Sequence, residues 1–155
     1  MTHRYGLYIG AYSESQGIYA VRKEVSEFIT ERDGFQADPN DIFLTNGASD
    51  GVRLCMQTIM RDVASGYEDG IMTPIPQYPL YSALITLMNG HFVPYHLDEE
   101  HNWSCTPETL DDSLAKARAA GINVRGLVVI NPGNPTGIHT SHLTCYINLS
   151  THGMA

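Results

Sequence analysis

The sequence predicts an α/β fold in which a mostly parallel sheet with crossover helices follows an N-terminal helix. Apolar residues recur at helical spacing, short apolar runs lie between the helical segments, and glycine, proline or asparagine separates them. Strands that alternate with helices imply right-handed crossovers and parallel pairing. The 155 residues suffice for one domain with a core, and a hydrophobic content of 43% is typical of a globular chain.

The first helix is expected to begin after Ser15, a suitable N-cap, and to end at the turn signal Asp33-Gly34. Arginine, lysine and glutamate fill the positions between its apolar residues, which favours an amphipathic helix of about four turns. Its expected apolar face consists of Ile18, Val21, Val25, Phe28 and Ile29.

Four strands and three further helices are expected after this helix. The strands are predicted at residues 42–45, from residue 71, at 91–97 and at 127–130, and the helices from about residue 50, at 80–88 and from 107. Pro74 and Pro76 are expected to stop the second strand. The last run is apolar throughout, which predicts a strand buried on both faces.

Capping signals mark the helix after Thr106, which has Pro107 at its first position and Gly121 just past its end. In the helix near residue 50, Cys55 is interpreted as a small apolar packing residue. Residues 138–155 have no helical or strand period and are expected to form a tail without regular structure.

The charge and the cysteines exclude several classes of protein. A net charge of -8 argues against nucleic acid or an anionic membrane as the main partner, because both need a basic face. The three cysteines are widely spaced, which indicates reduced thiols.

The sequence starts with no signal-peptide pattern and has no membrane-length apolar stretch, so a cytoplasmic location is expected. A mitochondrial location stays open if residues precede Met1. No metal ligands are assigned.

Ligands of open α/β sheets bind beyond the carboxyl ends of the strands, and the first such end carries Thr45-Asn46-Gly47-Ala48-Ser49-Asp50-Gly51. The free N–H groups of the following helix and the hydroxyl of Ser49 suit a phosphate. Alternatively, Ser49 or Asp50 only caps the helix. The charge of Asp50 would repel a phosphate unless the carboxylate is turned away.

Two further strand ends carry residues suited to a planar ligand. Tyr78 lies between prolines and can stack on a ring, or it can pack the helix start together with Tyr81. Asn134 lies in Asn-Pro-Gly-Asn-Pro-Thr-Gly, residues 131–137, and its amide can donate to a phenolate oxygen. The alternative there is a plain proline-rich turn.

Four strings together resemble class I pyridoxal-phosphate-dependent aminotransferases of fold type I, and within them the alanine aminotransferase branch. They are residues 10–17, Gly-Ala-Tyr-Ser-Glu-Ser-Gln-Gly; residues 47–51, Gly-Ala-Ser-Asp-Gly; residues 75–82, Ile-Pro-Gln-Tyr-Pro-Leu-Tyr-Ser; and residues 131–137. The resemblance covers roughly residues 9–137. A dinucleotide-binding module is disfavoured because its glycine fingerprint is missing.

The resemblance implies a cofactor, a site and a partner. Pyridoxal phosphate would be held by Ala48 and Ser49 at its phosphate, by Tyr78 at its ring and by Asn134 at O3′, while Gly10 would lie in a segment that closes over the substrate carboxylate. The substrates would be an amino acid and a 2-oxo acid, and the partner a second copy of the enzyme. Residues 1–37 would be an N-terminal segment and helix, and 38–137 part of a large domain whose seven strands have the order 3-2-4-5-6-7-1.

The family's catalytic residues find no match in these 155 residues. The Schiff-base lysine of a Ser-x-Ser-Lys string, the aspartate facing the pyridinium and the arginine that grips the substrate carboxylate would all follow Gly137. The chain's two lysines, Lys23 and Lys116, are interpreted as surface residues. We therefore expect part of an aminotransferase for L-alanine and 2-oxoglutarate, inactive by itself. The alternative is a non-catalytic chain that pairs with a full-length homologue.

Overall fold

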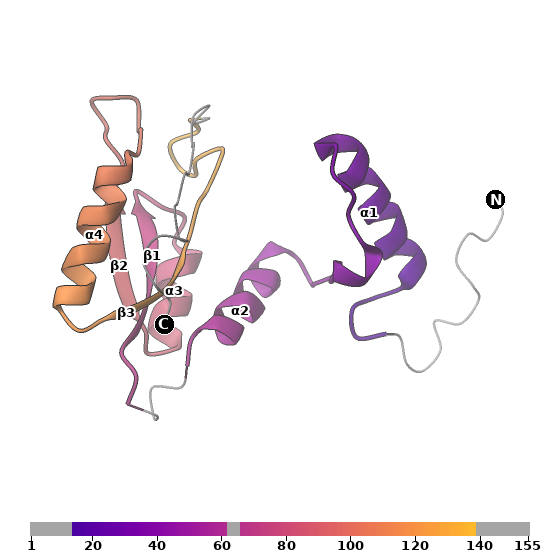
Figure 1. The fold of residues 1–155 in the computed structure, drawn as a ribbon, viewed down its shortest axis with the longest axis horizontal. Coiled ribbons are helices and arrows are strands. Elements are labelled where there is room, and N and C mark those ends of the chain that lie inside the picture. Colours follow the sequence, from indigo (N-terminus) through magenta and orange to yellow (C-terminus); the bar gives the residue numbers. More distant parts are fainter. Residues whose placement is uncertain (1–13, 62–65, 139–155) are drawn as a thin grey trace. The chain divides into compact units, whose positions relative to one another are not determined.

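The structure, a computed structural model, describes residues 14–61 and 66–138, and the chain divides into two compact units, residues 1–51 and 52–155. The elements follow in the order α1 (Tyr19–Asp33), η1 (Pro39–Asp41), α2 (Ala48–Ile59), β1 (Asp69–Ile75), α3 (Leu80–Leu87), β2 (His91–His96), α4 (Pro107–Ala119) and β3 (Asn123–Leu127) (Figure 1). This alternation confirms the predicted α/β class. None of the helices described is long and apolar enough to cross a bilayer.

The first unit is organised around a buried arginine on α1. Arg22 is only 2% exposed, and its guanidinium donates to the carbonyls of Gly17 at 3.0 Å and Pro39 at 2.7 Å and contacts the carboxylate of Glu14. Within this unit the expected apolar face of α1 is not the buried one, since Phe28 is exposed.

The start of α1 also differs from the prediction. Ile18, and not Ser15, is the N-cap of α1. Gly17, at a φ of 101°, closes a turn by donating its N–H to the carbonyl of Glu14 at 2.8 Å. Ser15 lies inside that turn, so it cannot cap the helix.

The strand predicted at residues 42–45 is wrong. The short helix η1 precedes this segment, which is extended but belongs to no sheet in the part of the chain that the structure describes. Its backbone bond to a distant residue runs from the N–H of Leu44 to the carbonyl of Gln16 at 2.9 Å, and its other backbone bonds are turn bonds to Pro39 and Gly47. An apolar run becomes a strand only where a neighbouring strand offers a ladder of such bonds.

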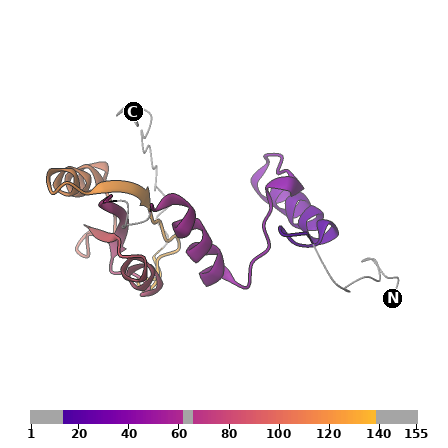
Figure 2. The same ribbon diagram turned by 90° about the horizontal axis from the view of Figure 1, so that it is seen from below.

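The second unit contains a three-stranded parallel sheet in the order β2-β1-β3. The predicted third, second and fourth strands are therefore neighbours, as expected. Met56 and Met60, in and just after α2, and Leu84 and Ile85 of α3 pack with Ile71 on one face of the sheet. α4 covers the other face of the sheet (Figure 2). There Ala117 packs with residues of β1 and β2, namely Met72, Val93 and Tyr95.

The strand buried on both faces is β1, and not the predicted run at 127–130. β3 ends at Leu127, and Val129 is 43% exposed because β3 is an outer strand of this sheet. Pro74 lies inside β1 instead of ending it. Met72 accepts from Val128 on the β3 side and Ile75 accepts from Leu97 on the β2 side. The backbone groups of successive strand residues face opposite neighbours, so those of Pro74 face β3. The pairing of β1 with β3 ends at Met72 and Leu127, so the missing N–H of Pro74 breaks no bond of that ladder.

α2 begins at Ala48, two residues earlier than expected. Its buried residue is Met56, whereas Cys55 is exposed, so the packing role predicted for Cys55 is wrong. Neighbouring helical residues point about 100° apart, and the face that Met56 turns to the core excludes Cys55.

α4 matches its prediction. Thr106 is the N-cap and its hydroxyl accepts the N–H of Thr109 at 3.3 Å, Pro107 is the first helical residue, and Gly121 has a φ of 79°. α3, predicted at 80–88, ends at Leu87, and the chain turns at Asn89, which has a φ of 54°. The tail predicted at 138–155 lies, apart from Ile138, outside the described residues.

Candidate functional site

Tyr78 and Asn134 follow the carboxyl ends of neighbouring strands in the second unit. β1 ends at Ile75 and β3 at Leu127, and the two strands pair in parallel. Parallel strands have their carboxyl ends at one edge of a sheet, so the segments that carry Tyr78 and Asn134 leave from the same edge (Figure 1). Open α/β sheets bind ligands at this edge.

Tyr78 lies between Pro76, which follows a cis peptide bond, and Pro79, the N-cap of α3. Its side chain is 48% exposed, whereas Tyr81 packs against the core. The proposed packing role therefore suits Tyr81, and Tyr78 has ring surface that a planar ligand can cover. Beside it the Oε1 of Gln77 is buried and has no hydrogen-bond partner among the described residues.

Asn134 lies in a compact turn after β3. Gly133 donates its N–H to the carbonyl of Ile138 at 2.8 Å, and Gly137 donates to the carbonyl of Gly133 at 2.7 Å. A Cβ at Gly133 would collide with the hydroxyl of Thr136, so a larger residue there would force that side chain to turn. The exposed side chain of Asn134 can therefore meet a ligand from a fixed backbone.

The first turn of α2 presents N–H groups without helical partners. A bond of its ladder runs from the N–H of Gly51 to the carbonyl of Gly47 at 3.3 Å, and the N–H groups of Ala48 and Ser49 precede it. Ser49 is the second helical residue and hence not the N-cap. The carboxylate of Asp50 accepts from the N–H of Asn46 at 3.4 Å, which directs it back to the preceding turn.

These donors fit pyridoxal phosphate, the cofactor that the resemblance implies. The N–H groups of Ala48 and Ser49 and the hydroxyl of Ser49 suit its phosphate, an exposed ring suits its pyridine, and the amide of Asn134 suits its phenolate oxygen. Ala48 and Ser49 belong to the first unit, and Tyr78 and Asn134 to the second. Gly10 lies outside the described residues.

Both lysines are exposed side chains on helices. Lys23 lies 3.6 Å from Glu27, one turn further along α1, and Lys116 lies in the last turn of α4. Neither follows the carboxyl end of a strand, where the other candidate residues of the second unit lie. This agrees with their interpretation as surface residues.

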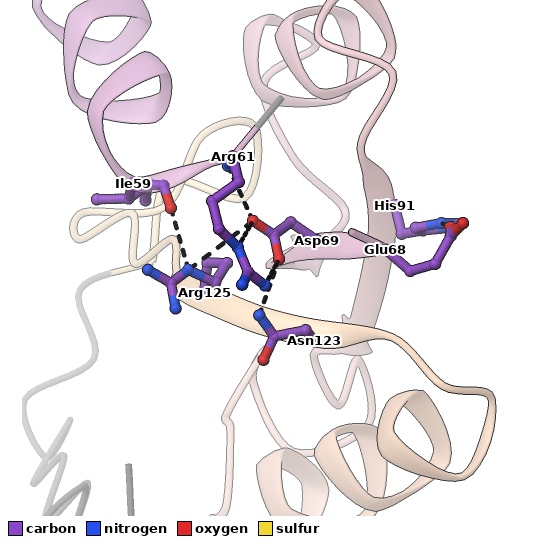
Figure 3. Close-up of polar contacts among 7 residues, drawn as sticks. All are labelled: Ile59, Arg61, Glu68, Asp69, His91, Asn123 and Arg125. Atoms are coloured by element: carbon purple, nitrogen blue, oxygen red, sulfur yellow. Dashed lines mark hydrogen bonds and ion pairs between the residues drawn. The ribbon is translucent and has the colours of Figure 1, made fainter. Parts of the chain in front are cut away.

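A buried carboxylate lies at the amino end of β1, the strand whose other end leads to Tyr78 (Figure 3). Asp69 is 2% exposed and accepts three bonds from Arg61, at 2.9 Å from its backbone N–H and at 3.0 and 2.6 Å from its guanidinium. Asn123 of β3 donates a fourth at 2.8 Å. The Arg61 side chain, more than any other group, holds the pKa of Asp69 well below its usual value.

The Asp69 contacts tie the end of α2 to the starts of β1 and β3. Arg125 of β3 completes the link by donating its Nε to the carbonyl of Ile59, the last residue of α2, at 3.1 Å. Sequence reasoning missed this network. An acidic residue two positions before the apolar run that starts at Ile71 was the available signal.

We expect Asp69→Asn to lower the free energy of unfolding at pH 7 by about 2–3 kcal/mol, because charge-assisted bonds are lost in a buried site. The folded pKa lies below the unfolded value of about 3.9, so this stabilisation is complete above that value and declines as the pH falls below about 4. Urea unfolding of dilute protein between pH 3 and pH 7, followed by the fluorescence of Trp103, measures it.

The wild type should lose stability towards pH 3 more steeply than Asp69→Asn. Asp112→Asn, which changes an exposed carboxylate on α4, is the matched control and should follow the wild type. If the free energy of unfolding falls equally towards pH 3 in the wild type and in Asp69→Asn, the assigned role of the Asp69 carboxylate is contradicted.

Comparison with known proteins places this geometry in a family. The profile of aminotransferase class I and II matches residues 8–144. Glutamate–glyoxylate aminotransferase 2 of Arabidopsis thaliana is 54% identical over 129 residues, which cover 83% of this chain and 26% of the relative. Alanine aminotransferase 2, mitochondrial, of the same plant is 54% identical over 137 residues, 88% of this chain and 25% of the relative. The chain thus spans about a quarter of the length of these relatives.

Solved structures agree with the sequence relatives. Alanine aminotransferase from Pyrococcus furiosus superposes with a TM-score of 0.70 at 26% identity, over 83% of this chain and 30% of that one. An aminotransferase from Escherichia coli gives a TM-score of 0.69 at 30% identity, over 85% and 30%. The described fold is therefore part of the fold of these enzymes.

Proposed function

The chain belongs to the aminotransferase class I and II family, and we propose that its residues form part of an enzyme that exchanges an amino group between L-alanine and 2-oxoglutarate with pyridoxal phosphate. The observation that carries the proposal is 54% identity to an alanine aminotransferase over 88% of this chain. Since neither lysine matches the family's Schiff-base position, the 155 residues are inactive by themselves in this proposal. Within this chain, residues 38–137 form part of the large, cofactor-binding domain.

Four residues hold the cofactor in this proposal. The N–H groups of Ala48 and Ser49 and the hydroxyl of Ser49 donate to the phosphate, where the helix dipole also favours an anion. Tyr78 stacks on the ring and Asn134 donates to O3′. When bound, the cofactor supplies an electron-withdrawing ring that stabilises negative charge on the substrate. Gly10 belongs to the segment that covers the substrate carboxylate.

A second activity has equal support from identity. Glutamate–glyoxylate aminotransferase 2 is as similar to this chain as the alanine enzyme, at 54%. Both activities move an amino group between an amino acid and a 2-oxo acid, and the four cofactor residues serve either. Sequencing the transcript beyond Ala155 and assaying any longer product with each substrate pair distinguishes them.

A non-catalytic role is the alternative from another class. Enzymes of the resembled family act as homodimers, so this chain would pair with a full-length homologue and alter its activity. Co-expression with a tagged alanine aminotransferase tests this role, because a stable mixed dimer elutes as one species at a fixed ratio. Recovery of the homologue alone would contradict it.

We propose the cytoplasm as the location, with no nucleic acid or membrane as partner. Mitochondria are the alternative, since the name of the Arabidopsis alanine aminotransferase states that location.

We expect the chain to bind pyridoxal phosphate weakly and without a covalent bond. Ser49→Ala should weaken binding about tenfold, as expected for one hydrogen bond to a charged group. Tyr78→Ala should weaken it about fivefold by removing the stacking ring. Titration followed by cofactor absorbance measures both. The control is Ser113→Ala, which removes a hydroxyl that bonds only within α4; equal affinities for all variants would contradict the assignment.

A further inference from the structure

The loop that carries Asn134 is held at its origin by a residue two strands away. Tyr95, on β2, is 4% exposed, and its hydroxyl donates to the carbonyl of Val128 at 2.7 Å. Val128 is the first residue after β3. Because β1 lies between β2 and β3, this bond spans the width of the sheet.

The same peptide segment is fixed from its other side. The N–H of Val128 donates to the carbonyl of Met72 on β1 at 2.8 Å. Val128 thus uses its donor on the central strand and its acceptor on the hydroxyl of Tyr95. Two bonds in opposite directions define where the chain leaves the sheet and in which direction it continues.

The turn that carries Asn134 has little freedom of its own. The two Asn-Pro steps fix φ at Pro132 and Pro135, and the bonds of Gly133 and Gly137 close the turn. Residues 129–131 join Val128 to this turn, so the direction in which the chain leaves Val128 sets where the turn, and Asn134 with it, begins.

We propose that Tyr95 is a positioning residue for the cofactor: its hydroxyl, through Val128, directs the loop so that the amide of Asn134 meets O3′ of pyridoxal phosphate. This inference rests on the proposed function. A phenylalanine would fill the same core space between Met72 and Ala117, so packing alone gives no reason for the hydroxyl.

The test uses the 155-residue chain, pyridoxal phosphate as the probe and a double-mutant cycle. Tyr95→Phe should weaken binding about fivefold, the effect of one misdirected hydrogen bond. It should also speed amide exchange at Val128, Gly133 and Gly137. In the background of Asn134→Ala the fivefold loss should vanish, because the residue through which Tyr95 acts is gone.

Leu114→Val, in the same core cluster, is the control for a general loss of stability and should leave the affinity unchanged. If Tyr95→Phe binds like the wild type, or loses the same factor with and without Asn134, the positioning role is refuted and the proposed function stands. If the wild type shows no binding at millimolar cofactor, the cofactor site proposed for this chain fails, and the role of Tyr95 fails with it.

Discussion

The purified 155-residue chain is expected to release no pyruvate from L-alanine above the rate that free pyridoxal phosphate gives. In the enzymes it resembles, one lysine binds the cofactor covalently and moves the substrate proton. Losing a nucleophile and a general base together lowers a rate by at least about 10⁴-fold. Lys23 and Lys116 cannot replace it, since both are exposed on helices.

A lactate dehydrogenase-coupled assay with L-alanine, 2-oxoglutarate and added cofactor measures this rate. A full-length alanine aminotransferase, mixed in at a known ratio, shows the detection limit. Turnover above the cofactor-only rate that disappears in Lys23→Arg or Lys116→Arg would show that one of these lysines acts in catalysis and would overturn the prediction.

Sequence predictions were accurate where an element depends on neighbouring residues and inaccurate where it depends on residues far along the chain. α4 was located closely because Thr106, Pro107 and Gly121 act within a few residues of the helix ends. Strand limits depend on distant partners. The runs at 42–45 and 127–130 are both apolar, yet among the described residues only the second joins the sheet. Leu127 pairs with Met72 of β1, and the N–H of Val128 donates to the carbonyl of Met72.

The candidate site divides in the same way. The segments of Tyr78 and Asn134 follow strand ends, and parallel pairing brings such ends to one edge, so their common location was predictable. The contact of Tyr95 with Val128 joins residues 33 apart, and that of Asn123 with Asp69 joins residues 54 apart. No local spacing marks such pairs.

The burial of the Arg22 guanidinium could not be predicted from the sequence either. Arg22 occupies a polar position of an amphipathic pattern, which predicts a solvated side chain. It is buried because oxygen atoms of Gly17, Pro39 and Glu14 surround its guanidinium. Their positions depend on the turn before α1 and on η1, which no periodicity specifies.

The second large effect concerns the stability of the isolated chain, which we expect to be marginal and prone to aggregate. Large apolar side chains are exposed in both units, among them Phe35 at 80%, Phe43 at 66% and Leu87 at 74%. Fixing each backbone residue costs about 1–2 kcal/mol of conformational entropy. Apolar side chains that stay exposed contribute no burial free energy to offset that cost. The outer strand β3 leads into the half-exposed Val129, and edges of this kind pair with other chains.

Sizing between about 1 and 100 µM should therefore show association that grows with concentration, and melting followed by circular dichroism should be broad. Val129→Lys places a charge beside the β3 edge and should reduce association. Thr58→Lys, on the exposed side of α2, adds the same charge elsewhere and should not. A monomer at every concentration with one sharp transition above about 50 °C, within the range of ordinary domains, would refute the prediction, because exposed apolar surface and an open edge would then be compatible with independent folding.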